Sequence, residues 1–156
     1  MAIRVLLVER VTLLAEAIKA VLMEAEIDVV ETFSSPREAI AFLERNQPDV
    51  IVMNLDLMDD LPIETIMKRR PFGGRPDDWM GSGRWILKRW PDARILLLSS
   101  LGDPLVADRA LCAGFWGFLT RRSILTELVG AIQAIADGQK VLSKGLLPPS
   151  DDARDD

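Results

Sequence analysis

Several polar side chains that could do chemistry follow directly after short apolar runs. They are Glu9 with Arg10, Asn54, Ser99 with Ser100, and Thr120 with Arg121. Arg10 and Arg121 together could bind an anionic ligand, because guanidinium groups match the geometry of carboxylate and phosphate groups. The chain has no histidine and a single cysteine, Cys112. Histidine-based nucleophile chemistry, a disulfide framework and a cysteine zinc site are therefore excluded.

The apolar runs are short and continuous, which is typical of strands buried in a parallel sheet. Five strands are predicted, over residues 3–8, 27–31, 50–53, 95–98 and 117–120. Helical signals lie between them, so five β-α units are expected. They predict an α/β fold, a doubly wound five-stranded parallel sheet with helices on both faces. In such sheets function lies at the carboxyl ends of the strands, where the polar residues above stand.

The helices are predicted from apolar spacing and from capping residues. The first has an apolar stripe formed by Leu13, Leu14, Ala17, Ile18, Val21 and Leu22. A capping box at Ser35–Glu38 starts the second, whose expected core residues are Ala39, Phe42 and Leu43. Further helices are expected over about 61–69, 85–89 and 104–112. The last one ends at Gly138, and its buried face is predicted to carry Ile124, Leu125, Leu128, Ile132 and Ile135.

Composition and charge restrict the class of protein further. The chain has 156 residues, of which 49% are hydrophobic and 28% charged, as expected for one globular domain. Its net charge of −5 offers no basic surface for nucleic acid. It has no apolar run long enough for a membrane span and no signal-peptide pattern, so a cytoplasmic location is expected. Residues 144–156 are expected to form an acidic linker or a disordered tail.

Five segments stand in a particular order along the chain. They are Ile3–Arg10, Pro48–Asn54, Pro91–Ser100, Ala113–Arg121 and Ala134–Ser143. Together they resemble the receiver domain of bacterial response regulators of the NarL/LuxR type, over about residues 2–143. The resemblance implies the flavodoxin-like receiver fold, (βα)5, within a domain of residues 1–143. It also implies a role in two-component signal transduction and transcription regulation.

The sequence departs from this family at most of the positions that carry its chemistry. In the family an aspartate after the third strand accepts a phosphoryl group, and two acids after the first strand help to hold Mg²⁺. Here the acceptor position is Asn54, an amide that cannot form an acyl phosphate, and the acid pair is Glu9 with Arg10. Ser99 is retained, and the family's lysine position is Arg121. These residues are predicted to form a degenerate phosphorylation pocket.

The charge of this pocket limits what it can bind. One carboxylate, one neutral amide and two guanidinium groups give a formal charge of +1, where the family's three acids and one lysine give −2. Weak or absent Mg²⁺ binding is therefore expected, with no cofactor, no metal site and no phosphorylation. Arg10 could fill the metal's place against Glu9 and Asn54, or it could face solvent. Asp56, in the loop, is the alternative acceptor.

The stretch after Asn54 is longer than the resemblance predicts. Asn54 to Pro91 spans 37 positions, about 17 more than the family has there. The insertion is placed at about 59–82. It could be a tolerated surface insertion, or a lid that pairs with Arg10 or Arg121 in place of a phosphoryl group. The acids available to such a lid are Asp59, Asp60, Asp77 and Asp78.

The resemblance also implies a partner surface. Phe118 stands at the position of the switch aromatic, and Trp116 beside it could anchor an interface or pack under the preceding helix. A homodimer is expected, because receivers usually signal through symmetric pairs. A DNA-binding domain is expected C-terminal to this chain. Direct binding of nucleic acid or of a membrane by residues 1–156 is not expected.

The function predicted from these observations is that of an atypical, phosphorylation-independent receiver, or pseudo-receiver. It would act as a protein–protein and dimerisation module, and not as an enzyme. The first alternative is a ligand-sensing receiver that binds a small anionic metabolite at the former phosphorylation pocket. The others are a conventional regulator that accepts phosphate on Asp56 or Glu9, and an enzyme of flavodoxin-like fold.

Overall fold

The structure is a computed structural model that describes residues 2–54, 79–99, 102 and 104–143, the side chains of 79–82 excepted. Six parallel strands form one sheet in the order β2-β1-β3-β4-β5-β6. Their bounds are β1 (Arg4–Val8), β2 (Asp28–Phe33), β3 (Val50–Asn54), β4 (Ile95–Ser99), β5 (Gly117–Thr120) and β6 (Val141–Leu142). Because all strands run the same way, their carboxyl ends meet at one edge of the sheet.

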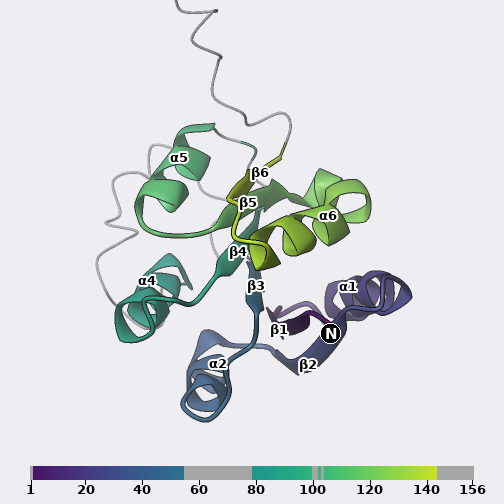
Figure 1. Cartoon of the computed structure of the whole chain (residues 1–156), viewed down its shortest axis with the longest axis horizontal. Coiled ribbons are helices and arrows are strands. Elements are labelled where there is room, and N and C mark those ends of the chain that lie inside the picture. Colours follow the sequence, from purple (N-terminus) through teal and green to yellow (C-terminus); the bar gives the residue numbers. More distant parts are fainter. Residues whose placement is uncertain (1, 55–78, 100–101, 103, 144–156) are drawn as a thin grey trace, which may run out of the picture.

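Helices cover both faces of the sheet (Figure 1). One face carries α2 (Pro36–Leu43), α4 (Trp79–Arg89) and α5 (Pro104–Cys112). The other carries α1 (Thr12–Glu24) and α6 (Ile124–Ala136), which follows the short 3-10 helix η2 (Arg121–Ser123). The first turn of α2 is capped as its sequence predicts, since Ser35 Oγ accepts a hydrogen bond from the Glu38 N–H at 3.5 Å.

Two hydrophobic clusters, one on each face, hold the layers together. Along β1, Leu6 and Val8 point to the α2-α4-α5 side, and Val5 and Leu7 point to the α1-α6 side. Strands β3 and β4 alternate in the same way. Burial on both faces is the reason that these strands read as continuous apolar runs rather than as an alternating pattern.

The predicted α/β fold with a parallel sheet is confirmed, but the expected number of strands is wrong. A sixth strand, β6, pairs with β5 through Gly117 with Val141 and Phe118 with Leu142. Two residues are too few to produce a periodic pattern, and the strand exists because of this long-range pairing.

Some details of the predicted helices are also wrong. Leu13, Ala17 and Leu125 were assigned to buried faces and are exposed. The predicted Ile18 and Leu22 are buried, and Ala15, which the predicted stripe omitted, completes the buried side of α1. Residues 79–82, placed in the predicted insertion, belong to α4. The rest of the insertion (including the helix expected at 61–69) and the tail at 144–156 lie outside the described residues. No helix in the described ranges is both long and apolar enough to span a membrane.

Candidate functional site

Glu9 is buried at the carboxyl end of β1, with 3% of its surface exposed. Its main-chain N–H donates to the Phe33 carbonyl at 2.9 Å, which fixes it against the end of β2. Its Oε1 accepts a hydrogen bond from the Val11 N–H at 2.9 Å, and its Oε2 accepts one from Nδ2 of Asn54. Both oxygens of this carboxylate are therefore satisfied by groups of the chain itself.

Asn54 is half-buried at the end of β3, next to β1 in the sheet. Hydrogen bonding fixes its amide orientation, because the reverse orientation would set the amide oxygen against a carboxylate oxygen of Glu9. Its Oδ1 is buried and has no hydrogen-bond partner among the described residues. The position at which the resemblance expects the acceptor carboxylate thus presents a hydrogen-bond donor to Glu9.

Ser99 and Arg121 stand at the ends of the next two strands. Ser99 is fully buried and pairs in register with Thr120 of β5. Arg121 follows Thr120 directly, opens η2 and is half-buried. The sheet therefore brings the predicted residues from β1, β3, β4 and β5 to one edge, as the parallel topology requires.

Arg10 does not take the place predicted for it within the pocket. Its side chain is exposed, and it makes no hydrogen bond or ion pair with the residues that the structure describes. Each oxygen of the buried Glu9 carboxylate already accepts one hydrogen bond, from Val11 and from Asn54, so its burial does not depend on a contact with Arg10. Of its two predicted positions, Arg10 adopts the solvent-facing one.

The two aromatic residues of the predicted partner surface lie on different faces. Phe118 is fully buried in the cluster that contains α5. Trp116 is half-buried against the opposite cluster, on the α1-α6 side, so it does not pack under α5 as one interpretation had it. Its ring lies 4.7 Å from the guanidinium carbon of Arg94 and 5.9 Å from Nζ of Lys140. The Trp116 ring therefore lies within cation–π distance of two cations.

A cluster of three hydroxyl groups beside Arg121 was not foreseen from the sequence. Thr120 Oγ1 lies 3.1 Å from Ser123 Oγ, and Ser143 Oγ lies 3.3 Å from the same atom. Ser143 Oγ also accepts from the Thr120 N–H at 2.9 Å. Ser143 is 20 residues from Ser123, and only the pairing of β6 with β5 brings it there, so no local signal could have identified it.

The donors at this edge do not fit the Mg²⁺ that the resemblance implies. Mg²⁺ is held through carboxylate oxygens, and at this edge the described residues offer only Glu9. Both of its oxygens are engaged. In the described part of the chain, no three acidic, cysteine or histidine side chains gather to hold a metal. Asp56, the alternative acceptor, lies outside the described residues.

Comparison with known proteins supports the interpretation of the fold. No family model matches the chain. The transcriptional regulatory protein DegU of Brevibacillus brevis is 25% identical over 137 residues, which cover 87% of this chain and 51% of DegU. The response regulator protein VraR of Staphylococcus aureus is 27% identical over 148 residues, 94% of this chain and 63% of VraR. The chain spans about half of DegU and somewhat more of VraR.

Solved structures agree with this similarity. A two-component response regulator of the LuxR family from Aurantimonas sp. SI85-9A1 superimposes with a TM-score of 0.77 at 25% identity, covering 100% of both chains. The isolated receiver (REC) domain of RcsB from Salmonella enterica serovar Typhimurium gives a TM-score of 0.74 at 17% identity, covering 92% of this chain and 95% of that domain. The fold is that of a receiver domain. Sequence and structure together support a response-regulator receiver of the NarL/LuxR type.

Proposed function

We propose that the chain is an atypical receiver module that works without phosphorylation, through contacts with other protein molecules. The observation that carries the proposal is the hydrogen bond from Asn54 Nδ2 to the buried Glu9 carboxylate. A receiver that accepts phosphate needs a carboxylate nucleophile at this position and free carboxylate oxygens for the cation. Here the position is an amide, and the neighbouring carboxylate is already satisfied.

We extend the proposal to the whole protein only through its relatives. DegU is named a transcriptional regulatory protein, and RcsB, with the receiver fold at 18% identity and a TM-score of 0.73, has been solved as two dimers bound to DNA. We propose that this chain is likewise the regulatory part of a cytoplasmic transcriptional regulator, with DNA contacts made by a separate domain. The net charge of −5 fits a module that does not itself contact DNA.

The ligand-sensing alternative receives less support. It needs both guanidinium groups to converge on one anion, whereas Arg10 is exposed and Arg121 is half-buried.

Intact mass spectrometry after incubation with acetyl phosphate and Mg²⁺ tests the proposal. The unmodified mass is expected for the wild type, because the acceptor position is an amide and the Glu9 carboxylate beside it is buried and hydrogen-bonded within the chain. Asn54→Asp is the matched variant, since it differs only in supplying the missing carboxylate, and a conventional receiver treated in parallel shows that the donor is active. A single phosphoryl adduct on the wild type, on Asp56 or elsewhere, would overturn the proposal.

A further inference from the structure

A pocket lies at the amino edge of the sheet, opposite the edge that carries Glu9 and Asn54. Two turns border it, one at Pro48 before β3 and one at Pro91 before β4. The helices that lead into these turns, α2 and α4, contact each other. This amino-edge pocket has a volume of about 210 Å³. The residues that line it include Leu43, Asn46, Pro48, Trp90, Pro91 and Asp92.

The volume of the amino-edge pocket suits a ligand of one or two rings. An apolar cavity of about 150 Å³ takes up benzene, whereas sites for larger ligands begin at about 300 Å³. Leu43 and Ile51 line the pocket from the hydrophobic cluster of this face and give it an apolar surface. Trp90 is half-buried and adds a flat aromatic side. A flat ring therefore finds both an apolar and an aromatic surface here.

Contacts within the chain hold Trp90 in position. Its N–H donates to the Ile86 carbonyl at 2.7 Å, and its own carbonyl accepts from the Ala93 N–H at 3.0 Å. The second hydrogen bond closes a four-residue turn with Pro91 in its second position, which the fixed φ of proline favours. The Trp90 ring also packs edge to face against Trp85, with the ring centroids 6.1 Å apart. The aromatic side of the pocket is therefore preorganised, which lowers the cost of binding.

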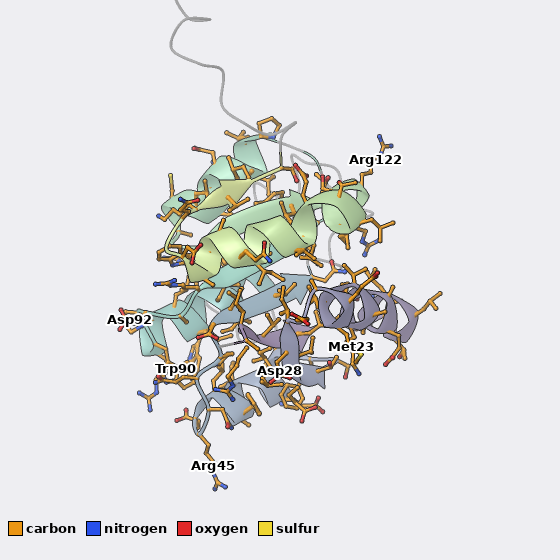
Figure 2. The ribbon with its side chains drawn as sticks, turned by 45° about the vertical axis from the view of Figure 1, so that its right-hand side comes forward. Met23, Asp28, Arg45, Trp90, Asp92 and Arg122 are labelled. Carbon is orange, nitrogen blue, oxygen red and sulfur yellow. The ribbon has the colours of Figure 1, made fainter. Side chains whose placement is uncertain are left out.

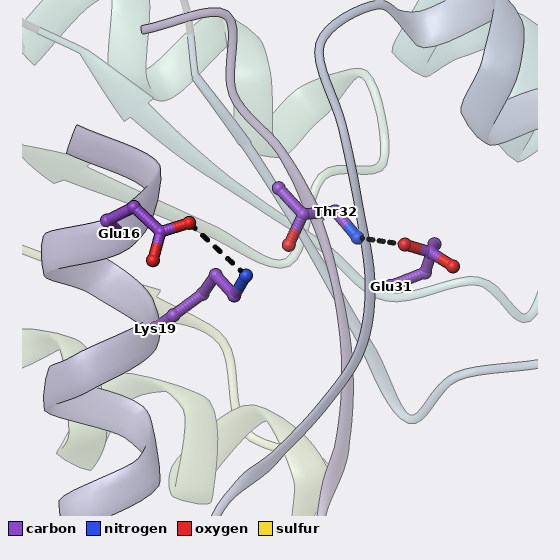
Figure 3. A network of polar contacts seen from close by, with 4 residues as sticks. All are labelled: Glu16, Lys19, Glu31 and Thr32. Atoms are coloured by element: carbon purple, nitrogen blue, oxygen red, sulfur yellow. Dashed lines mark hydrogen bonds and ion pairs between the residues drawn. The ribbon is translucent and has the colours of Figure 1, made fainter. Parts of the chain in front are cut away.

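The positive charge that lines the pocket is offset within the chain. Arg89 Nη2 donates to Glu44 Oε2 at 3.3 Å, and the guanidinium carbon of Arg89 lies 5.4 Å from the centre of the Trp90 ring. This ion pair connects the end of α4 with the end of α2, whereas the pair of Glu16 with Lys19 at 3.4 Å lies within α1 (Figure 3). The charges of Arg89 and Glu44 therefore cancel beside the pocket.

The other polar groups of the lining are rich in hydrogen-bond acceptors. Asp92 is exposed in the turn after α4, where Figure 2 marks it with Trp90, and it makes no hydrogen bond or ion pair with the described residues. Asn46 Nδ2 donates to the Phe42 carbonyl at 3.1 Å, which fixes the amide orientation and leaves Oδ1 as an acceptor. Gln47 is exposed beside it and can present either end of its amide. The pocket thus has one negative charge that is not offset, on Asp92.

We propose that the amino-edge pocket binds a small planar cation, an aromatic molecule of one or two rings that bears an amidinium group. Its ring lies against Trp90 and the apolar lining, and its N–H groups donate to Asp92 and to Asn46 Oδ1. An amidinium group presents two parallel N–H donors, the geometry that a carboxylate accepts best. The inference goes beyond the proposed function, because it gives the receiver a chemical input at the edge opposite Glu9 and Asn54.

Calorimetric titration with benzamidine tests the pocket, and benzoate is the matched ligand of similar size and opposite charge. We expect saturable binding of benzamidine by the wild type, and binding of benzoate that is weaker by about tenfold or more. Asp92→Asn should weaken benzamidine binding by about tenfold, because the charged acceptor is lost. Asp108→Asn, which removes an exposed carboxylate from α5, is the control and should bind as the wild type does. Both variants lower the general attraction of a chain with net charge −5 equally.

Filling the pocket tests where the ring binds. Ala93 is half-buried in the lining, so Ala93→Leu should occupy the space and abolish benzamidine binding, and thermal unfolding checks that this variant is folded. The inference is overturned if the wild type does not bind benzamidine saturably or binds benzoate as tightly. It is equally overturned if Asp92→Asn binds as the wild type does, or if Asp108→Asn weakens binding as much as Asp92→Asn. None of these results bears on phosphorylation, which the intact mass decides separately.

Discussion

Glu9 and Asn54 form a pair in which each group has the polarity that the other needs. The carboxylate can only accept, and the amide nitrogen can only donate. The backbone N–H of Val11 donates to the other carboxylate oxygen, so each oxygen of Glu9 accepts a hydrogen bond from the chain. This is the local reason that the site can be buried without a cation.

Exchanging the two polarities tests this pairing. Asn54→Asp places two carboxylates next to each other. Glu9→Gln places the new amide N–H₂ against either the Val11 N–H or Asn54 Nδ2, both of which are donors. Each single variant should therefore lower the free energy of unfolding by about 1–3 kcal/mol. In the double variant the glutamine accepts from Val11 and donates to the new aspartate. Urea unfolding should show that it recovers most of the loss. If the double variant instead loses as much free energy of unfolding as the two single variants together, the side chains are not coupled.

Residue positions at the site were partly predictable from the sequence. Glu9, Asn54, Ser99 and Arg121 follow apolar strands, and parallel strands end at one edge, so their common location could be inferred. The exposed position of Arg10 could not, because the sequence does not show that Val11 and Asn54 supply the hydrogen bonds of Glu9.

At the scale of elements, β5 packs so closely against its neighbours at Gly117 that a side chain there has no room. A Cβ at Gly117 would lie 2.7 Å from Leu96 Cδ1, 3.0 Å from Ile135 Cδ1 and 3.2 Å from the Val141 carbonyl oxygen. The absence of a side chain there allows β4, α6 and β6 to approach the same point. Arg94 also holds α6, since its Nη1 donates to the carbonyls of Ile135 and Ala136 at 2.7 and 2.9 Å.

Two glycine-to-alanine changes should therefore have opposite effects. Gly117→Ala should lower stability by about 1–3 kcal/mol through overpacking. Gly130→Ala, in open space within a helix, should raise it by about 0.5–1 kcal/mol. Thermal unfolding of both variants beside the wild type, at one dilute protein concentration, measures the two shifts. Equal shifts would contradict the close contacts at Gly117.

The elements with strong local signals were predictable, and those that depend on distant contacts were not. The first five strands and the capped start of α2 follow from apolar runs and from Ser35. Strand β6 needs β5 beside it, and the edge of the buried side of α1 could not be chosen because Leu13, Leu14 and Ala15 are consecutive apolar residues. The exposed Leu13 is one result of that ambiguity.

At the scale of the whole molecule, the core and the site are separate. Both hydrophobic clusters consist of apolar residues from strands and helices, and neither contains Glu9, Asn54, Ser99 or Arg121. Changes at these four positions therefore need not disturb the core, and the TM-score of 0.77 with the Aurantimonas structure shows that the receiver fold is kept.

Calorimetric titration of Mg²⁺ into the wild type and into Asn54→Asp tests the central claim most directly. The claim is that an internal amide–carboxylate pair has replaced the divalent-cation site. We expect no saturable binding by the wild type, and tighter binding by Asn54→Asp, in which two carboxylates converge. Saturable Mg²⁺ binding by the wild type, as tight as that of the variant, would contradict the account.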